Sequence, residues 1–220
     1  MGKKNISKEK IIQSFLRCAF EKSAGATSLS DIADDLEIKK ASLYNHFGSR
    51  EAMYNASIEY CEGAIKGIKF LPITYLQTIK NNKTTPVMMF KHLIARFFEI
   101  YENDPFFAMY SFIHTEQYFN INALNIVKAE NSMIREDIKS AINAFIASGQ
   151  IEDKGENEIE DASQIIGSVI VQKLDFYIAN RKEIVRQNPD SGVGSLFALP
   201  TDETEVNNTT KIVGSYLNEL

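Results

Sequence analysis

Apolar residues recur at intervals of three and four along most of the chain, which is the spacing that places them on one face of an α-helix. The first such segment is Lys8–Lys22, and a longer one follows Ser49 and continues to Ile68. Thr85-Pro86 predicts the start of a helix that continues to about Glu102, because threonine caps helices and proline suits the first helical position. No strand-like alternation of convincing length occurs, so the predicted fold is all-α.

Further helices are expected in the rest of the chain, each bounded by proline, glycine or a capping residue. Pro72 interrupts the pattern, and residues 81–85 are expected to form a loop. The expected helical ranges are residues 106–118, 121–147 and 158–186, with a last helix from about residue 204. The connection at about 188–203 is long for a compact domain. Its apolar run Leu196–Pro200 is expected to pack on the helical bundle or on a partner subunit.

Residues 27–51 predict two short helices joined by a tight turn and followed by the start of a third. Ser28 and Asp31 fit a capping box at the start of the first helix, and Leu36-Glu37-Ile38 forms the turn. In the second helix, Leu43 and Phe47 lie four residues apart and point inward, so that small and polar side chains face outward. A short helix of this kind, with cations at its start, suits the DNA major groove. The segment therefore predicts a helix-turn-helix whose recognition helix spans about residues 39–46.

The same segment resembles the N-terminal signature of the TetR family of transcriptional regulators. The resemblance rests on Asp31-Ile-Ala, Ser42-Leu-Tyr-Asn-His-Phe and Ser49-Arg-Glu, and it covers about the first quarter of the chain. The chain departs from the family pattern at Glu37 and Ala41, where glycine is common, and in a shorter loop at residues 23–26. Glu37 lacks the tolerance of glycine for positive φ, so a strained or altered turn is expected.

Charge is distributed unevenly along the chain. The formal net charge is −5, yet residues 1–50 carry nine Lys and Arg against six acids, which leaves 15 against 23 for the rest. A basic N-terminal part on an acidic remainder permits an approach to phosphate. The apolar runs are too short to span a bilayer, no signal peptide is evident, and Cys18 and Cys61 are expected to be buried thiols. These features predict a cytoplasmic protein with no membrane partner.

Patterns that would support catalysis are missing from the sequence. The histidines 46, 92 and 114 lie in separate predicted helices and form no metal-ligand spacing. There is also no Gly-x-Ser-x-Gly sequence and no glycine-rich phosphate loop. We therefore expect a protein that is not an enzyme and that holds no cofactor or metal.

The residues expected to contact DNA fall into two groups. Lys39, Lys40, Ser42 and Asn45 are expected to reach bases or adjacent phosphates. Thr27, Ser28, Tyr44, His46 and Arg50 are expected to bind phosphate and to fix the register on the duplex. For Tyr44 and His46 this role is what the family resemblance implies.

Aromatic residues are concentrated in one segment of the second half. Ten of the 23 aromatic residues lie between Phe90 and Phe119, with methionines among and beside them. Such side chains line adaptable apolar cavities, but they also fill the core of a helical bundle. The resemblance implies a cavity, because TetR-like proteins hold inducers in the corresponding segment. The predicted ligand-binding residues are Phe90, Phe97, Phe98, Tyr101, Phe107, Tyr110, His114, Gln117 and Phe176, with Arg96 and Asn120 as further polar anchors.

A subunit interface is expected at the last two helices, since TetR-like proteins form a four-helix bundle from them. The predicted interface residues are Ala162, Ile166, Val169, Ile170, Val213 and Leu217, although the same stripes also suit an intramolecular core. Residues 1–50 are accordingly predicted to form a DNA-binding domain and residues 51–220 a ligand-binding and dimerisation domain.

These features together predict a homodimeric regulator of transcription that responds to a ligand. It would bind a palindromic double-stranded DNA operator, act as a repressor, and be released by a small apolar or aromatic effector. One alternative is a helical sensor or carrier that acts through a protein partner and does not bind DNA itself. The other is a helical-bundle enzyme.

Overall fold

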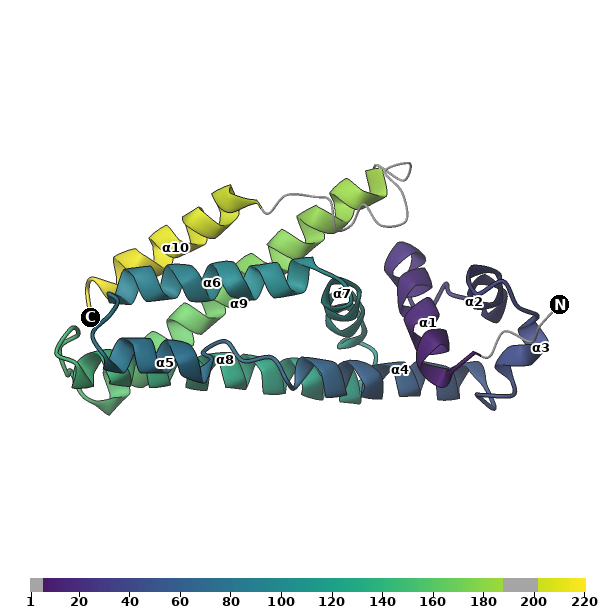
Figure 1. Ribbon diagram of the computed structural model, residues 1–220, viewed down its shortest axis with the longest axis horizontal. Helices are drawn as coiled ribbons and strands as arrows, with labels where there is room; N and C mark the ends of the chain where they lie inside the picture. The colour runs from purple at the N-terminus through teal and green to yellow at the C-terminus, as the bar shows by residue number, and fades with distance from the viewer. Residues whose placement is uncertain (1–5, 188–201) are drawn as a thin grey trace. The chain divides into compact units, whose positions relative to one another are not determined.

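The computed structural model describes residues 6–187 and 202–220, and within these residues it contains ten α-helices and no strand (Figure 1). The chain divides into two compact units. We call residues 1–67 with 108–127 the head unit, and residues 68–107 with 128–220 the body unit. The chain therefore passes between the units three times, after residues 67, 107 and 127.

The head unit contains α1 (Lys8–Lys22), α2 (Leu29–Asp35), α3 (Lys40–Leu43) and α4 (Arg50–Ile65). It also includes α7 (Phe106–Glu116) from Ala108 onward and the first residues of α8 (Ile121–Ala147). Serine side chains cap α1, α2 and α4, because each Oγ accepts a hydrogen bond from a backbone N–H three residues later. Its core is formed by fully buried side chains that include those of Ile11, Phe15, Ile32, Leu43, Met53 and Cys61.

The body unit contains α5 (Ile73–Lys80), α6 (Pro86–Glu102), the rest of α8, α9 (Glu156–Gln187) and α10 (Glu203–Leu217). Helix α10 packs on α6 and α9. The approach to α6 is close at Gly214, where a Cβ atom would lie 3.2 Å from Cγ1 of Val87. Glycine at this position therefore lets the two helices come together.

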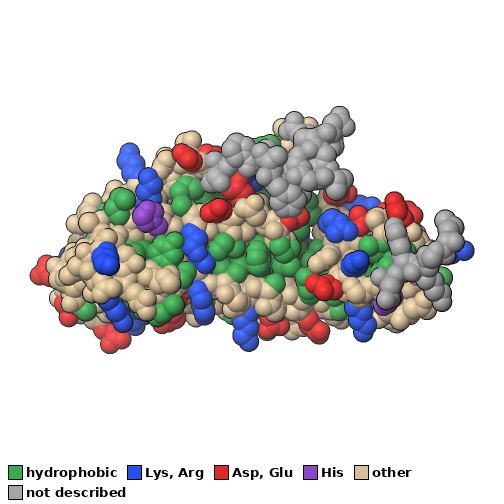
Figure 2. Space-filling model, viewed as in Figure 1, with side chains coloured by type: hydrophobic (Ala, Val, Ile, Leu, Met, Phe, Trp, Pro, Cys, Tyr) green, Lys and Arg blue, Asp and Glu red, His purple; other side chains and the backbone are tan. Residues whose placement is uncertain are grey.

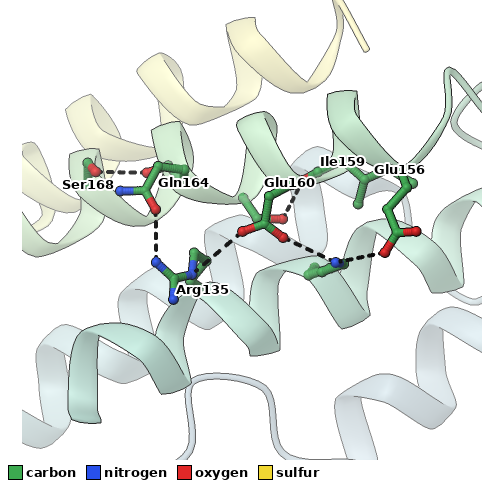
Figure 3. A network of polar contacts seen from close by, with 8 residues as sticks. Arg135, Glu156, Ile159, Glu160, Gln164 and Ser168 are labelled. Carbon is green, nitrogen blue, oxygen red and sulfur yellow. Dashed lines mark hydrogen bonds and ion pairs between the residues drawn. The ribbon is translucent and has the colours of Figure 1, made fainter. Parts of the chain in front are cut away.

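Helices α8 and α9 are also joined by a row of polar contacts (Figure 3). The ammonium of Lys139 lies 3.3 Å from the carboxylate of Glu156 and 3.1 Å from that of Glu160. The guanidinium of Arg135 donates to Gln164 at 3.0 Å. Exposed pairs of this kind contribute little free energy each. They lie near Gly167 of α9, where a Cβ atom would come within 3.7 Å of Cδ1 of Ile138 on α8.

Most of the helices expected from the sequence are confirmed. The ranges 8–22 and 121–147 agree at both ends, and the helix expected from Pro86 to Glu102 is α6. Helix α5 was not expected, because its eight residues are too few to give a clear period. The apolar run at residues 196–200 lies outside the described residues. The division expected at residue 50 stays a prediction, and the compact units follow a different division because α4 and α7 pack with the head.

Both cysteines are buried and free, as the sequence predicts. Burial raises the pKa of the Cys61 thiol to about 12, and burial followed by the nearby acid Asp35 raises that of Cys18. A thiol with a raised pKa is a poor nucleophile at neutral pH. The two residues therefore serve as small apolar side chains of the head core.

The turn after α2 confirms the expectation for Glu37. Its φ is +54°, and the N–H groups of Glu37 and Ile38 donate to the carbonyls of Asp34 and Ala33 at 3.0 and 2.8 Å. This pattern is a Schellman motif, in which the left-handed position favours glycine. A residue with a Cβ atom is strained in this conformation.

Replacing Glu37 with glycine should therefore stabilise the head unit. The expected gain in the free energy of unfolding is up to about 1 kcal/mol, since relief of the strain outweighs the entropy that glycine adds to the unfolded chain. Chemical denaturation measures it. Glu37→Ala is the matched control, because it removes the same side chain and keeps the Cβ atom. Equal stability of the two variants would show that the backbone conformation is not the cause.

Candidate DNA-binding interface

The helix-turn-helix is held together by capping and ion pairs at the start of α2. The Ser28 hydroxyl accepts from the N–H of Asp31 at 3.2 Å, and the Asp31 carboxylate accepts from the N–H of Ser28 at 2.7 Å. The Lys22 ammonium lies 2.6 Å from the same carboxylate. Lys22 and then Ser28 hold the pKa of Asp31 at about 2. The predicted capping box is confirmed, and it ties α2 to the end of α1.

The recognition helix is shorter than the range expected for it. Regular α-helix is limited to α3, and the chain continues through tighter turns in which the N–H groups of Asn45 and His46 donate to carbonyls three residues earlier. Leu43 and Phe47 are 1% and 7% exposed and anchor this segment to the head core. Lys8 strengthens the anchoring, because its ammonium lies 5.6 Å from the centre of the Phe47 ring.

The side chains expected to read DNA lie on the outer side of this segment. Lys39, Lys40 and Asn45 are exposed, Tyr44 is 52% exposed, and Ser42 and His46 are half-buried. The structure therefore places all six where a surface contact requires them. Their contacts with bases or phosphates stay predictions.

Three of the residues expected to bind phosphate have other partners in the structure. Thr27 is fully buried, and its hydroxyl donates to the Ser23 carbonyl at 2.8 Å. The Ser28 hydroxyl is occupied in the capping box. The Arg50 guanidinium donates to the carbonyls of Thr27, at 2.9 Å from Nε, and of Ala24. The structure favours positioning roles for these residues, since they hold the chain that leads into α2.

Charge in the head unit is partly neutralised by internal pairs. Arg17 lies 2.6 Å from Asp35, and this pair joins α1 to α2 as Lys22 and Asp31 do. Lys39 and Lys40 are exposed beside the outer side of α3. Figure 2 shows acidic and basic side chains interspersed on the face that it displays. Two of the basic side chains of residues 1–50 are therefore neutralised by neighbouring carboxylates.

The predicted ligand-binding residues divide between the two units. Phe90, Phe97, Phe98, Tyr101 and Phe107 lie in the core of the body unit and are at most 2% exposed. The rings of Phe97 and Tyr101 are 5.1 Å apart, and the Tyr101 hydroxyl donates to the buried carboxylate of Glu130. Burial raises the pKa of Tyr101, so that its hydroxyl stays a donor.

The other predicted ligand-binding residues lie elsewhere. Tyr110, His114 and Gln117 belong to the head unit, where the rings of Tyr110 and His114 stack at 3.7 Å. Phe176 is 61% exposed on α9, because it projects from the side of the helix opposite to the core. Two polar anchors also have structural partners. Arg96 donates to the Lys69 carbonyl at 2.8 Å, and Asn120 accepts from N–H groups in the first turn of α8.

Most of the predicted interface residues are covered within a single subunit. Ala162, Ile166, Ile170, Val213 and Leu217 are at most 4% exposed. Only Val169 is half-buried. The apolar side chains that α9 and α10 leave exposed are Ile165, Phe176, Ile184 and Ile212. The predicted interface residues stay a prediction, and Ile165 and Ile212 are each one position away from a predicted residue.

Two buried polar groupings were missed by the sequence reasoning. In the body unit, the Glu102 carboxylate accepts from the Tyr177 hydroxyl at 2.7 Å and from the Arg181 guanidinium. In the head unit, the Tyr54 hydroxyl donates to the Glu116 carboxylate at 2.7 Å. The only signal was the four-residue spacing of Tyr177 with Arg181, which is common in helices, and the sequence gives none for Tyr54 with Glu116.

Within the described part of the chain, no group of three or more His, Cys, Asp and Glu residues has an arrangement that could hold a metal ion. Among the described residues there is likewise no helix with the length and apolar character needed to cross a membrane.

The sequence of the head matches known regulators. Residues 11–57 match the family model described as bacterial regulatory proteins, tetR family. Over 54 residues the chain is 44% identical to the biofilm operon icaADBC HTH-type negative transcriptional regulator IcaR of Staphylococcus aureus strain Newman. The IcaR of Staphylococcus epidermidis is 43% identical over the same length. The match spans 24% of this chain and 29% of each relative.

Solved structures with the same fold extend over nearly the whole chain. A putative TetR-family transcriptional regulator from Mesorhizobium loti has a TM-score of 0.59 at 12% identity and covers 96% of this chain and 95% of its own. A TetR transcription regulator from Haloarcula marismortui has a TM-score of 0.56 at 13% identity and covers 97% of both chains. FadR from Bacillus subtilis, in complex with stearoyl-CoA, has a TM-score of 0.55 at 14% identity and covers 94% and 97%. Residues 11–57 therefore carry the tetR-family sequence, and the chain as a whole shares its fold with TetR-family regulators.

Proposed function

We propose that this protein is a DNA-binding repressor of transcription that acts as a homodimer and is released from its operator by a small apolar or aromatic effector. The observation that carries the proposal is the outer side of the α3 segment. There, Lys40, Tyr44 and Asn45 are exposed on a helix whose inner side chains, Leu43 and Phe47, are buried. A helix with this distribution suits the major groove.

The dimer is supported by the apolar surface of α9 and α10. A groove of about 240 Å³ between these helices is lined by the side chains of Ile165, Val169, Ile212 and Tyr216, among others. Ile165 and Ile212 are 44% and 46% exposed within one subunit, so that a second copy would cover them. A two-fold dimer would place two α3 segments at half-sites about 34–36 Å apart on a palindromic operator.

The effector class is supported by the aromatic core of the body unit. Phe90, Phe97 and Tyr101 on α6 are fully buried apolar side chains, and the Tyr101 hydroxyl with its acceptor Glu130 adds a polar pair beside them. FadR, whose fold is similar, was solved in complex with stearoyl-CoA, a ligand with a long apolar chain. Apolar pockets with few polar groups are typical of small-molecule sites. An effector that favours the conformation unable to bind DNA would release the operator by population shift.

The first prediction concerns DNA binding. Selection from a random-sequence DNA pool should yield a palindromic site, and fluorescence anisotropy should show salt-dependent binding to it. Lys40→Ala should weaken the affinity and reduce the salt slope by about 1 if Lys40 contacts phosphate. Lys80→Ala, which changes an exposed lysine of α5, is the control and should bind as the wild type does. Failure to select any DNA would favour a sensor that acts through a protein partner.

The second prediction concerns the dimer. The double variant with Ile165→Asp and Ile212→Asp should be a folded monomer in analytical ultracentrifugation. Both side chains are exposed in one subunit, whereas a buried unpaired carboxylate in an interface is costly. Ile73→Asp, which changes a 65% exposed isoleucine of α5, should leave the dimer intact. A double variant that stays dimeric would remove this face from the interface. Val213 is unsuitable for the test because it is 1% exposed and belongs to the subunit core.

The third prediction concerns the effector. Hydrophobic compounds that bind the folded state should raise Tm in a thermal-shift screen. Phe97→Ala and Phe107→Ala should reduce that rise in Tm, and each should cost less than the ~3–5 kcal/mol usual for truncating a packed phenylalanine. Phe145→Ala, at a fully buried position of α8, should lose the full ~3–5 kcal/mol of stability and still show the compound-induced rise in Tm. If no compound raises the Tm of the wild type and every variant loses the full ~3–5 kcal/mol of stability, the aromatic side chains form only a core.

A further inference from the structure

Helix α7 is packed on the DNA-binding helices by three aromatic rings. The Phe112 ring lies 5.7 Å from that of Phe15 on α1 and 5.9 Å from that of Tyr54 on α4, with interplanar angles of 87° and 82°. Phe15 and Tyr54 complete the triangle at 6.4 Å. Edge-to-face pairs at these distances are favourable beyond the area that they bury. Since Phe15 is fully buried and Phe112 is 4% exposed, this triangle is part of the head core.

One turn after Phe112, α7 also forms a hydrogen bond with α4. The Tyr54 hydroxyl donates to Oε2 of Glu116 at 2.7 Å, and Glu116 is 8% exposed. Burial and then the Glu116 carboxylate raise the pKa of Tyr54, so that the hydroxyl remains a donor at any physiological pH. A buried carboxylate that loses such a donor keeps its desolvation cost. The bond therefore fixes where the end of α7 lies on α4.

The contacts continue from Tyr54 to the start of α2. Arg50 lies one turn before Tyr54 and donates to the carbonyls of Ala24 and Thr27. Thr27 is followed by Ser28, the N-cap of α2. An open cleft of about 370 Å³ is lined together by the loop at Ala24 and Gly25, the first turns of α4, and Glu116. The first two turns of α4 thus contact α7 on one side and the helix-turn-helix on the other.

The path of the chain makes these contacts relevant to regulation. Residues 108–127 of the head unit are connected at both ends to the body unit, on one side through Phe107 and on the other inside α8. The preceding helix, α6, carries the aromatic residues proposed above to meet an effector. Only residues 103–105 separate α6 from α7, and α8 runs from one unit into the other without a break, so that both helices have a short covalent connection to residues 108–127.

We propose that Glu116 is a positioning residue for DNA binding. Because Glu116 accepts the hydrogen bond of Tyr54, it holds α7 on α4, so that the position of α7 and the orientation of the helix-turn-helix change together. This inference rests on the proposed function, since it assigns the route by which the body unit influences operator binding. It predicts reciprocity, because coupling between two sites is equal in both directions. DNA bound to α3 must then stabilise α7, as an effector acting on α7 must alter DNA binding.

The test measures hydrogen–deuterium exchange of the full-length protein with and without the DNA selected by the wild type. In the wild type, DNA should slow exchange in residues 108–116 as well as in α1–α4. Tyr54→Phe keeps the ring in the aromatic triangle and removes only the hydroxyl, and Glu116→Leu keeps a similar size and removes both acceptor oxygens. In both variants DNA should still slow exchange in α1–α4. The factor by which DNA slows exchange in residues 108–116 should fall by about tenfold, which corresponds to ~1.4 kcal/mol of coupling.

Tyr60→Phe is the matched control, because Tyr60 is also on α4 and its hydroxyl bonds Glu9 and Gln13 of α1 at 3.3 Å. It should respond to DNA as the wild type does. The inference is overturned if DNA protects α1–α4 in the wild type without affecting α7, or if Tyr54→Phe and Glu116→Leu transmit protection normally. Absence of any DNA binding by the wild type is a different result, since it contradicts the proposed function itself.

Discussion

The four residues of α3 cannot hold a helical conformation by themselves, and the structure of the head follows from this constraint. Isolated helices shorter than about 12–15 residues are marginal in water, because nucleation fixes several dihedral angles for one hydrogen bond. Helix α3 therefore depends on Leu43 and Phe47, which are buried in the head core. Helix α2, with seven residues, depends in the same way on its capping box and on the ion pairs to α1. The segment that would contact DNA is thus held in place by the buried side chains, the capping box and the ion pairs around it.

Those surroundings include parts of the chain that are distant in sequence. Arg50 of α4 holds the carbonyls of the loop before α2, and Tyr54 of the same helix contacts Phe112 and Glu116 of α7. A repressor must keep its reading helix ordered and still allow a ligand elsewhere to change its affinity. Contacts with directional hydrogen bonds and packed rings meet both needs, because they have discrete arrangements rather than a continuous range.

The sequence predicts the helices of this protein better than it predicts the roles of single side chains. Helix ends were predictable where serine, threonine-proline or serine-glycine marks a boundary, as at Ser7, Thr85 and Gly149. The positive φ at Glu37 was predictable from a departure at one position of the family pattern. Helix α5 was not predictable, because eight residues after a proline contain too few apolar positions to define a face.

Site residues were harder because type and spacing do not reveal which partner a side chain meets. Arg50 has the charge that phosphate requires, yet its guanidinium is used by two backbone carbonyls. Phe176 and Tyr177 are neighbours of similar size, but one is exposed and the other is buried beside Glu102. Tyr54 and Glu116 are separated by 62 positions, and nothing in either local sequence indicates the other.

The chain crosses between the two units three times, and this limits how the head unit could be joined to a different sensor domain. The segment that matches the family model ends at residue 57, whereas the compact head also contains residues 108–127. A head cut out as one continuous piece would leave Phe15 and Tyr54 without the ring of Phe112. In this protein the compact unit that carries the helix-turn-helix is therefore discontinuous in the sequence. Recombination that joined residues 1–67 to a different sensor would have to supply a substitute for α7, so that head and sensor are constrained to evolve together.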